Sequence, residues 1–531
     1  MAVGLVLLVG LLLRLYHLDF PSICYHNMQE NQYLSMADIM RKSGNYLTRN
    51  TYFDAIIFPE GAKRPLFKPP LVAYQILLSW MFLGENLWAP RLTNIAFSIG
   101  SILLVYFIGC LIFGSSILAI YSALLFAIMP LGVFFSQRLQ PDSAALFFML
   151  LGVFCYLRFV VSRGTLFLFG GGFSFFLAWL YKTHYIFGLI AVLFFIPWKN
   201  IKKEKPGLVK TVVIFFLPYL LILVYLGFYW VSGRWVLSIS FDFIKGILGI
   251  FSPSYWGSSW LGIRSYLVDN FTGFFTSFTA LGLLLAFLGE DVLLNRFLRG
   301  WAVTLLLYAM FFSQELRQQN FVQMPFLAMV CFASTSLVYF FAETVRRSLR
   351  LNILVVFLVG VLGLASPMVY GSLQRMYMSF FPGLEVAGVT LKELTAPNEH
   401  IFLLTHAQGY AIARYAQRYV DWPKDIKEFK DRQIRYNVRY ICISPLEYLL
   451  GIKRDQPEIF SYIQENFHIR ELGFAEEGRQ LAYIILEKGQ GQDLIKSLEN
   501  FSGPTQSRAV YNLYGRLIFF YSMQPGLPSP N

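Results

Sequence analysis

Long apolar runs separated by short polar connections occupy the first two thirds of the chain, up to about residue 371. A helix needs about 20 mostly apolar residues to cross about 30 Å of hydrocarbon. By that measure the pattern predicts about 11 transmembrane helices, and the fold class is a polytopic α-helical membrane protein. The runs lie near residues 2–16, 92–113, 115–135, 143–161, 165–181, 183–198, 211–232, 271–289, 301–313, 321–341 and 351–371.

One long polar insertion interrupts this pattern directly after the first run. It extends from Asp19 to Pro70 and contains a helical pattern over residues 34–43. The next segment, 71–83, is apolar but short for a spanning helix. We expect it to lie along the membrane surface as a juxtamembrane helix, so that residues 19–91 form one large first outer loop.

The composition changes near Gly371, where short apolar or alternating runs replace the long ones. Four of these runs predict β-strands, at residues 399–405, 438–444, 467–474 and 481–488. Helical patterns follow the first two, so we expect a small C-terminal α/β domain and a division of the chain into 1–371 and 372–531. Near a strand end, His406 is expected to be structural. The stretch 501–531 contains Pro and Ser and is expected to be a loosely held tail.

The net charge of +13 reflects membrane orientation rather than nucleic-acid binding. Many of the basic residues fall in short connections between apolar runs. These clusters are Arg158/Arg163, Lys199/Lys202/Lys203/Lys205/Lys210, Arg296/Arg299 and Arg346/Arg347/Arg350. If 71–83 does not cross the membrane, all four clusters lie on the same side as the N-terminus; if it crosses, all four lie outside. We therefore predict a cytoplasmic N-terminus and an extracytoplasmic first loop and C-terminal domain.

The polar residues of the first loop suit a reaction at a membrane surface. Glu30 can accept a proton, and Tyr33 lies one helical turn from it. Arg64 and Lys68 can stabilise an anion through charge-assisted hydrogen bonds. The residues alone favour a structural interpretation, in which Glu30 caps or pairs within the loop and Lys63, Arg64 and Lys68 bind lipid head groups.

Later polar residues also have two interpretations each. Arg91 either orients the loop or anchors the start of a span at the interface. Asp142 either binds an acceptor or belongs to a network with Arg138. Lys182 lies where two short spans meet, and it either lines a cavity or extends to the interface. The five cysteines show no metal-type spacing.

Several short motifs occur in order along roughly residues 10–200. They are Glu30-x-x-Tyr33-x-x-x-Ala37 followed by Gly44, Lys68-Pro69-Pro70-Leu71, Gly84 through Trp88-Ala89-Pro90-Arg91-Leu92, Asp142 after the third span, and Leu180-Tyr181-Lys182. In these motifs the chain resembles the GT-C type glycosyltransferases that use polyprenyl-phosphate sugars, namely the protein O-mannosyltransferase and lipid A aminoarabinose transferase families. The first outer loop of those families usually carries an Asp-Glu pair. Here the pair is Gln29-Glu30, so the first carboxylate is absent.

The resemblance implies an inverting hexosyl- or pentosyltransferase in a bacterial or archaeal cytoplasmic membrane. Its donor would be a polyprenyl-phosphate-linked sugar, and its acceptor a lipid, glycan or protein at the extracytoplasmic face. Glu30 would be the catalytic base. Substrate-binding roles would fall to Gln29, Tyr33, Arg64, Lys68, Arg91, Asp142 and Lys182. The expected partners include membrane lipids and no nucleic acid. No metal ligands are assigned, because one carboxylate is a weak metal site. A divalent metal cofactor stays open.

Two other functions stay open. The loss of the first carboxylate at Gln29 is typical of a catalytically lapsed relative that binds polyprenyl lipids without transferring sugar. A lipid or sugar transporter is the other alternative. Transporters usually show two similar halves with interrupted helices at corresponding positions. The sequence has no such repeat, and its single long first loop favours an asymmetric enzyme site.

Overall fold

The computed structural model describes residues 1–48, 50–53, 69–196, 212–231, 253–290, 292–351, 353–405, 408–421, 423–475, 480–499 and 504–524. The chain forms two compact units. The helical unit consists of Met1–Asp19, Phe67–Gln75 and Ser79–Met376. The sheet unit consists of Phe20–Leu66, Ile76–Leu78 and Tyr377–Asn531. The two units are therefore interleaved along the sequence.

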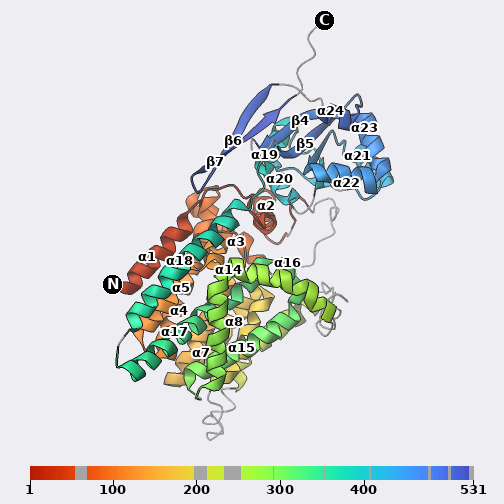
Figure 1. Cartoon of the computed structure of the whole chain (residues 1–531). Helices are drawn as coiled ribbons and strands as arrows, with labels where there is room; N and C mark the ends of the chain where they lie inside the picture. The colour runs from red at the N-terminus through yellow and green to blue at the C-terminus, as the bar shows by residue number, and fades with distance from the viewer. Residues whose placement is uncertain are drawn as a thin grey trace. The chain divides into compact units, whose positions relative to one another are not determined.

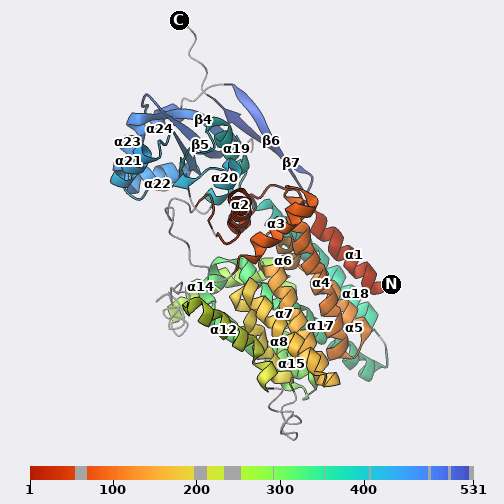
Figure 2. The same cartoon turned by 180° about the vertical axis from the view of Figure 1, so that it is seen from behind.

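Apolar helices build the helical unit, as the long apolar runs predict (Figures 1 and 2). They are α1 (Ala2–Leu15), α4 (Trp88–Phe113), α5 (Ser116–Ile128), α6 (Pro130–Ser136), α7 (Asp142–Ser162), α8 (Thr165–Tyr181), η1 (Thr183–Phe187), α9 (Gly188–Phe195), α12 (Leu217–Val231), α14 (Pro253–Leu288), α15 (Leu293–Phe311), α16 (Ser313–Gln318), η2 (Asn320–Phe326), α17 (Leu327–Leu349) and most of α18 (Leu354–Met378). The short α3 (Leu71–Leu83) has residues in both units. The predicted polytopic helical fold is confirmed.

The long apolar helices of the described residues are fewer than the predicted spans. Among the described residues, five helices are long and apolar enough to cross a membrane, and a sixth span results if the bent pair α5 and α6 counts as one. Shorter apolar helices, including α1, α3 and α8, accompany them. The figure of about 11 spans stays a prediction.

A buried arginine stabilises the bend between α5 and α6. The two helices meet at 56°, and Pro130 begins α6. Since proline has no N–H, the carbonyls of the preceding turn need other donors. Arg14 of α1 supplies one, because its guanidinium donates to the carbonyl of Ala127 at 2.7 Å and to the hydroxyl of Ser98 at 2.8 Å. Arg14 thus fastens α1 to α4 and to the bend, a role that the sequence did not suggest.

The end of α1 and the start of α4 lie at the same end of the helical unit. Arg91, in the first turn of α4, donates to the carbonyl of Leu18 at 2.8 Å. The intervening chain, which includes α3, therefore leaves from and returns to one end. This arrangement is the one expected if residues 71–83 form a juxtamembrane helix.

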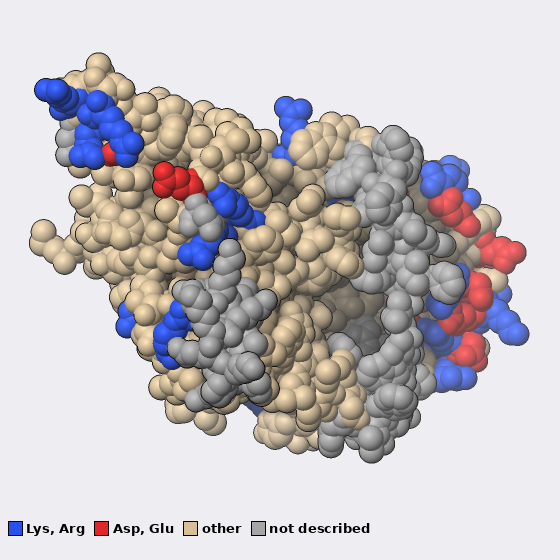
Figure 3. Space-filling view, turned by 90° about the horizontal axis from the view of Figure 1, so that it is seen from below, with Lys and Arg blue, Asp and Glu red and all other residues tan. Residues whose placement is uncertain are grey.

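One described basic cluster, Arg296 and Arg299, lies at the opposite end of the helical unit, toward which the N-terminal end of α1 points. Phe332 of α17 contacts both Phe113 at the end of α4 and Phe297 at the start of α15. Arg296 and Arg299 flank Phe297 and so lie at this end. From below, Lys and Arg form small separate groups on a mostly uncharged surface (Figure 3). The cluster at residues 199–210 lies outside the described residues.

The sheet unit contains one seven-stranded mixed sheet in the order β2-β1-β3-β5-β4-β7-β6. The strands are β1 (Ile401–Thr405), β2 (Val420–Asp421), β3 (Tyr440–Ser444), β4 (Phe467–Ala475), β5 (Gln480–Lys488), β6 (Thr505–Leu513) and β7 (Arg516–Met523). β1 pairs with β2 and β3 in parallel, and the other pairs are antiparallel. The four predicted strands correspond to β1, β3, β4 and β5, so the predicted α/β domain is confirmed.

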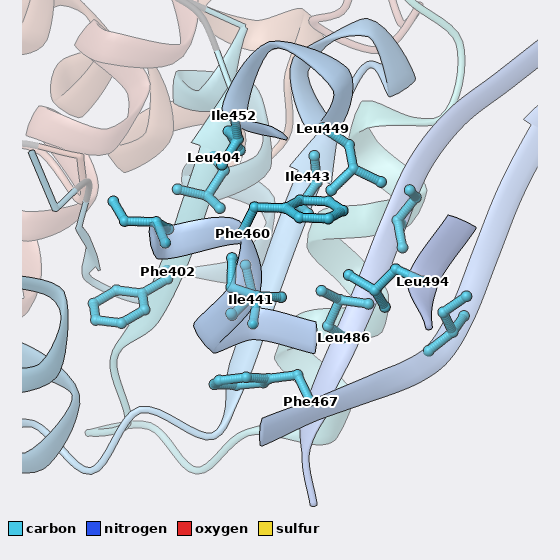
Figure 4. Close-up of a cluster of buried hydrophobic side chains, with 14 of the residues drawn as sticks. Phe402, Leu404, Ile441, Ile443, Leu449, Ile452, Phe460, Phe467, Leu486 and Leu494 are labelled. Atoms are coloured by element: carbon cyan, nitrogen blue, oxygen red, sulfur yellow. The ribbon is translucent and has the colours of Figure 1, made fainter. Parts of the chain in front are cut away.

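Helices cover both faces of this sheet. On one face, Phe402 and Leu404 of β1 and Ile441 and Ile443 of β3 form a buried apolar cluster with side chains of α22 (Leu446–Asp455), α23 (Pro457–Asn466) and α24 (Leu494–Glu499) (Figure 4). Phe429 of α21 (Ile426–Arg435) belongs to the same cluster. On the other face, α19 (Leu384–Leu394) places Thr390 against the buried Glu471 of β4. All five residues of β1 are buried, as expected for a strand covered on both sides.

The expectation of a loosely held tail is wrong for most of residues 501–531. Strands β6 and β7 form a hairpin at the edge of the sheet, around Tyr514 and Gly515. Both turn residues have positive φ, 52° and 79°, as two-residue hairpin turns favour. The prediction relied on Pro and Ser content and overlooked the continuous run of apolar and aromatic residues 517–521, which favours a strand.

The first part of the outer loop belongs to the sheet unit. Helix α2 (Asn27–Ser43) packs against α20 (Gly409–Ala416). The N–H of Val420, in β2, donates to the carbonyl of Tyr52 at 3.0 Å, so the loop continues the hydrogen bonding of the sheet edge. A division of the chain at residue 371 did not anticipate this grouping.

Candidate functional site

Helix α2 carries the candidate catalytic motif in its first turn. It begins at Asn27, earlier than the pattern over residues 34–43 predicts, and ends at Gly44, which has φ 66°. Glu30 is the acidic residue of the first turn, where it interacts favourably with the positive end of the helix dipole. The helix therefore presents Glu30, Gln29 and Tyr33 within about one turn of one another.

Glu30 is buried and held by a neighbouring hydroxyl. Only 1% of its surface is exposed, and Ser22 donates a hydrogen bond to its Oε2. Ser22 is fixed in turn, because its N–H donates to the hydroxyl of Tyr415 at 3.0 Å. A buried carboxylate with such a donor is held in one orientation.

A chain of amide side chains extends this support to the sheet unit's helix α20. Asn31 donates to the carbonyl of Ser22 at 2.7 Å and to the carbonyl of Asn27 at 3.0 Å. Asn27 donates to Oε1 of Gln408 at 2.7 Å, directly before α20. Gln408 could not be anticipated from the sequence, since it is 381 residues away from Asn27 along the chain.

Gln29 differs from its neighbour in having an unused acceptor. Its Oε1 is buried and makes no hydrogen bond within the described part of the chain. An unpaired buried carbonyl is unfavourable by about 1–3 kcal/mol. A substrate hydroxyl or amine could relieve this cost by donating to it.

A second polar centre lies in the helical unit, at the start of α7. The ammonium of Lys182 lies 2.9 Å from both carboxylate oxygens of Asp142, and the hydroxyl of Tyr185 donates to Oδ1 at 2.9 Å. The side chain of Asp142 is 1% exposed and that of Lys182 14%. Lys182 also lies 4.4 Å from the ring centroid of Phe321. Lys182 therefore lies in a buried ion pair, which is unlike an extension to the interface, one of the two interpretations that the sequence left open.

The turn before Asp142 is also fixed by buried polar contacts. Asn94 of α4 donates to the carbonyls of Arg138 and Gln140, the latter at 3.1 Å. The guanidinium of Arg138 lies over the ring of Phe134 at 4.8 Å. Asp142 therefore has Lys182 and Tyr185 as its partners here, and Tyr185 is a site residue that the sequence did not suggest.

The predicted site residues fall into three groups. Glu30, Gln29 and Tyr33 lie on α2 in the sheet unit. Arg91, Asp142 and Lys182 lie in the helical unit, where Asp142 and Lys182 are in contact and Arg91 holds the end of α1. The candidates Arg64 and Lys68 lie outside the described residues, as does His406. The structure therefore describes two of the three groups, one in each unit, and the third lies outside the described residues.

No metal site is evident in the part of the chain that the structure describes. Within it, no group of three or more His, Cys, Asp or Glu side chains comes close enough to hold a metal ion. The carboxylates of Glu30 and Asp142 are each engaged by a donor side chain.

Comparisons with known proteins bear on these two centres. The family model described as dolichyl-phosphate-mannose-protein mannosyltransferase matches residues 67–225. The matched stretch includes Lys68, Arg91, Asp142 and Lys182, whereas Glu30 precedes it. Over this stretch, which is under a third of its length, the chain is similar to that family. The resemblance inferred from the motifs is thereby confirmed.

A solved structure has the same fold as this chain. The crystal structure of ArnT from Cupriavidus metallidurans bound to undecaprenyl phosphate has a TM-score of 0.56 and 15% sequence identity. The similarity covers 91% of this chain and 97% of that protein, so it includes the sheet unit as well as the helices. The apo structure of the same ArnT has a TM-score of 0.49 at the same identity and coverage. A comparison with curated proteins finds no match.

Proposed function

We propose that this membrane protein transfers a sugar from a polyprenyl phosphate to a hydroxyl of a lipid, glycan or protein acceptor, with Glu30 as the general base. The observation that carries the proposal is the buried and oriented carboxylate of Glu30 in the first turn of α2. The undecaprenyl phosphate bound by the structurally similar ArnT supports a C55-type carrier as donor. The family match favours an enzyme over a transporter.

The proposed reaction proceeds with inversion at the sugar C1. Glu30 takes the proton of the acceptor hydroxyl while the acceptor oxygen forms a bond to C1. The bond between C1 and the phosphate oxygen breaks on the opposite face, and polyprenyl phosphate leaves with the electron pair. Because attack and departure occur on opposite faces, one carboxylate suffices and no covalent intermediate forms.

Gln29 supports substrate binding in this proposal. Its buried and unpaired carbonyl lies next to Glu30 in sequence, within reach of the same substrate. An amide accepts a hydrogen bond but takes no proton, so Gln29 orients a hydroxyl that Glu30 deprotonates. Tyr33, one turn further, offers a ring face and a hydroxyl to a sugar.

The leaving phosphate needs positive charge, and Lys68 and Arg64 are the candidates that the motif supplies. Release of polyprenyl phosphate from a panel of polyprenyl-phosphate sugars tests the function. In this assay Lys68→Ala should lower turnover far more than Lys63→Ala, since a charge-assisted hydrogen bond contributes about 1.5–3 kcal/mol. That range corresponds to roughly 10- to 150-fold in rate.

Lys68→Arg should recover part of the loss, because the charge persists while the geometry changes. Equal and mild effects of Lys63→Ala and Lys68→Ala would instead favour nonspecific binding of head groups. If the protein binds donors from the panel but releases no polyprenyl phosphate from any, the lapsed-relative alternative that Gln29 suggests is correct.

The ion pair of Asp142 and Lys182 plays a positioning part in this proposal. The ammonium of Lys182 is already neutralised by Asp142, so it is poorly suited to hold a phosphate by charge alone. The pair instead fixes the start of α7 relative to the end of α8. Arg91 does the same for the start of α4 and the end of α1.

The site is proposed to face the outside of a bacterial or archaeal cytoplasmic membrane, with the N-terminus in the cytoplasm. The basic end of the helical unit supports this orientation through the positive-inside rule. A cysteine introduced at Glu465, an exposed position of α23, should react with an impermeant thiol reagent in intact cells. A cysteine at Arg350, at the end of α17, should react only after the membrane is permeabilised.

The unsubstituted protein, with its five free cysteines, gives the background. Labelling of the Arg350→Cys protein in intact cells would show that the proposed orientation is inverted and that the site faces the cytoplasm.

A further inference from the structure

A pocket that the proposed reaction does not use lies within the sheet unit. Its volume is about 540 Å³, enough for one or two sugar rings. Its walls come from the end of α2, the end of α19, the turn after α19 and the turn between α20 and β2. The pocket is therefore built where the first outer loop meets the C-terminal domain.

The pocket is lined by positive charge. Lys42, Lys392 and Arg418 all line it, and no acidic residue does among the described ones. The guanidinium of Arg418 is 6% exposed, and its donors go to the carbonyls of residues 392, 395, 416 and 417 and to the hydroxyl of Thr395. Because none of these acceptors is a carboxylate, the charge of Arg418 has no ion-pair partner among them. Burial lowers the pKa of Arg418 from its ordinary value, because desolvation disfavours the charged form.

The carboxylate of Asp38 lies next to the pocket lining and already accepts hydrogen bonds from two of the lining residues. Asp38 accepts hydrogen bonds from Lys42 at 2.8 Å and from the hydroxyl of Tyr52 at 2.6 Å. Glu399 also acts on Arg418 at longer range, and it accepts a hydrogen bond from the N–H of Ala396. Three cations against these two anions leave an excess of positive charge.

The remaining lining groups suit a sugar better than a bare anion. The ring of Tyr419 is 36% exposed, and it packs against Tyr52 with ring centroids 5.7 Å apart. Exposed Asn398 and half-buried Gln417 place amide groups around it. An aromatic face with surrounding amides is the usual combination for a sugar ring, which stacks through its C–H groups and bonds through its hydroxyls.

The pocket is distinct from the proposed reaction centre. Lys42 lies 12 residues after Glu30 on the same helix, which corresponds to about 18 Å along the helix axis. A lipid surface fits poorly, because the aliphatic side chains of the lining are only Ile39, which is 7% exposed, and the small ring of Pro397.

We propose that this pocket binds a soluble saccharide that carries a phosphate or carboxylate group, at a site separate from the reacting sugar. Lys392 holds the anionic group, Tyr419 stacks on the ring, and Asn398 bonds its hydroxyls, while Lys42 stays paired with Asp38. The side chains of Lys392 and Asn398 make no hydrogen bond to the described residues and are available for these contacts.

The test measures ligand binding to the full-length protein by calorimetry without any donor, so it is independent of transfer activity. The probes are glucosamine 6-phosphate, glucuronate, neutral glucose and inorganic phosphate. We expect the two anionic sugars to bind more tightly than glucose and phosphate. Lys392→Glu should lower the affinity for both anionic sugars by about tenfold or more, as loss of a charge-assisted contact predicts.

A matched control and a second variant separate the contributions. Lys427→Glu reverses an exposed charge on α21, outside the pocket, and should leave binding unchanged. Asn398→Ala should weaken the binding of the sugars but not the binding of inorganic phosphate.

Three outcomes would overturn the proposal. The first is that no probe binds, or that Lys427→Glu weakens binding as much as Lys392→Glu. The second is that inorganic phosphate binds as tightly as the sugar phosphate, which would indicate a plain anion site. The third is that vesicles of phosphatidylglycerol displace the sugars, which would indicate a surface for lipid head groups.

Discussion

Replacement of Glu30 by Gln is expected to lower sugar transfer by roughly a hundred- to ten-thousandfold, the usual cost of losing a general base. The amide keeps the shape of the side chain and can still accept the hydrogen bond from Ser22. It cannot take a proton from the acceptor hydroxyl. Since the pair Gln29-Glu30 already lacks one carboxylate, the adjacent residue offers no substitute.

The measurement is single-turnover transfer from a polyprenyl-phosphate sugar, together with donor binding by the same protein. Donor binding should survive, because the base acts on the acceptor. Glu465→Gln, an equivalent change at an exposed position of α23, is the control and should have no effect. Near-full activity of the Glu30→Gln protein would show that the base lies elsewhere.

Breaking the buried ion pair from one side should be the most destabilising single change in the helical unit. Lys182→Met leaves the carboxylate of Asp142 buried with Tyr185 as its partner but without a counter-charge. Removing one member of a buried pair typically costs about 3–5 kcal/mol of folding free energy. Asp142→Asn should be similarly unfavourable, since it leaves the ammonium of Lys182 uncompensated.

The double variant Asp142→Asn with Lys182→Met should be more stable than either single variant, because no buried charge remains. Thermal unfolding of the purified proteins in one detergent measures all four members of this cycle. Arg454→Met, which breaks an exposed pair with Asp455, provides a control with little expected effect. Additive losses in the double variant would contradict a mutual compensation of the two charges.

Activity of the double variant separates the two interpretations of Asp142. A stable and active double variant supports a positioning role. A stable but inactive one would mean that Asp142 or Lys182 contacts the substrate, as the family resemblance implied.

The sequence by itself determined the membrane-spanning helical class and the small α/β domain. Both follow from local periodicity, because a helix in a membrane satisfies its own backbone and must be apolar along its length. β1 and β3 are short continuous apolar runs, because a strand that is buried on both faces needs apolar side chains on both. The catalytic role expected of Glu30 came from the resemblance of the motifs to known glycosyltransferases, since the residue types alone favoured a structural interpretation.

Only the tertiary structure decided which partners hold these groups. Glu30 depends on Ser22 and Tyr415, and Asp142 on Lys182 and Tyr185. The grouping of the first outer loop with the C-terminal domain and the basic pocket near Arg418 also arise from contacts between distant segments. Hydrogen bonds and ion pairs of this kind depend on distances of about 3 Å between side chains. Those distances follow from packing of the whole chain, and no local pattern of hydrophobic and polar residues encodes them.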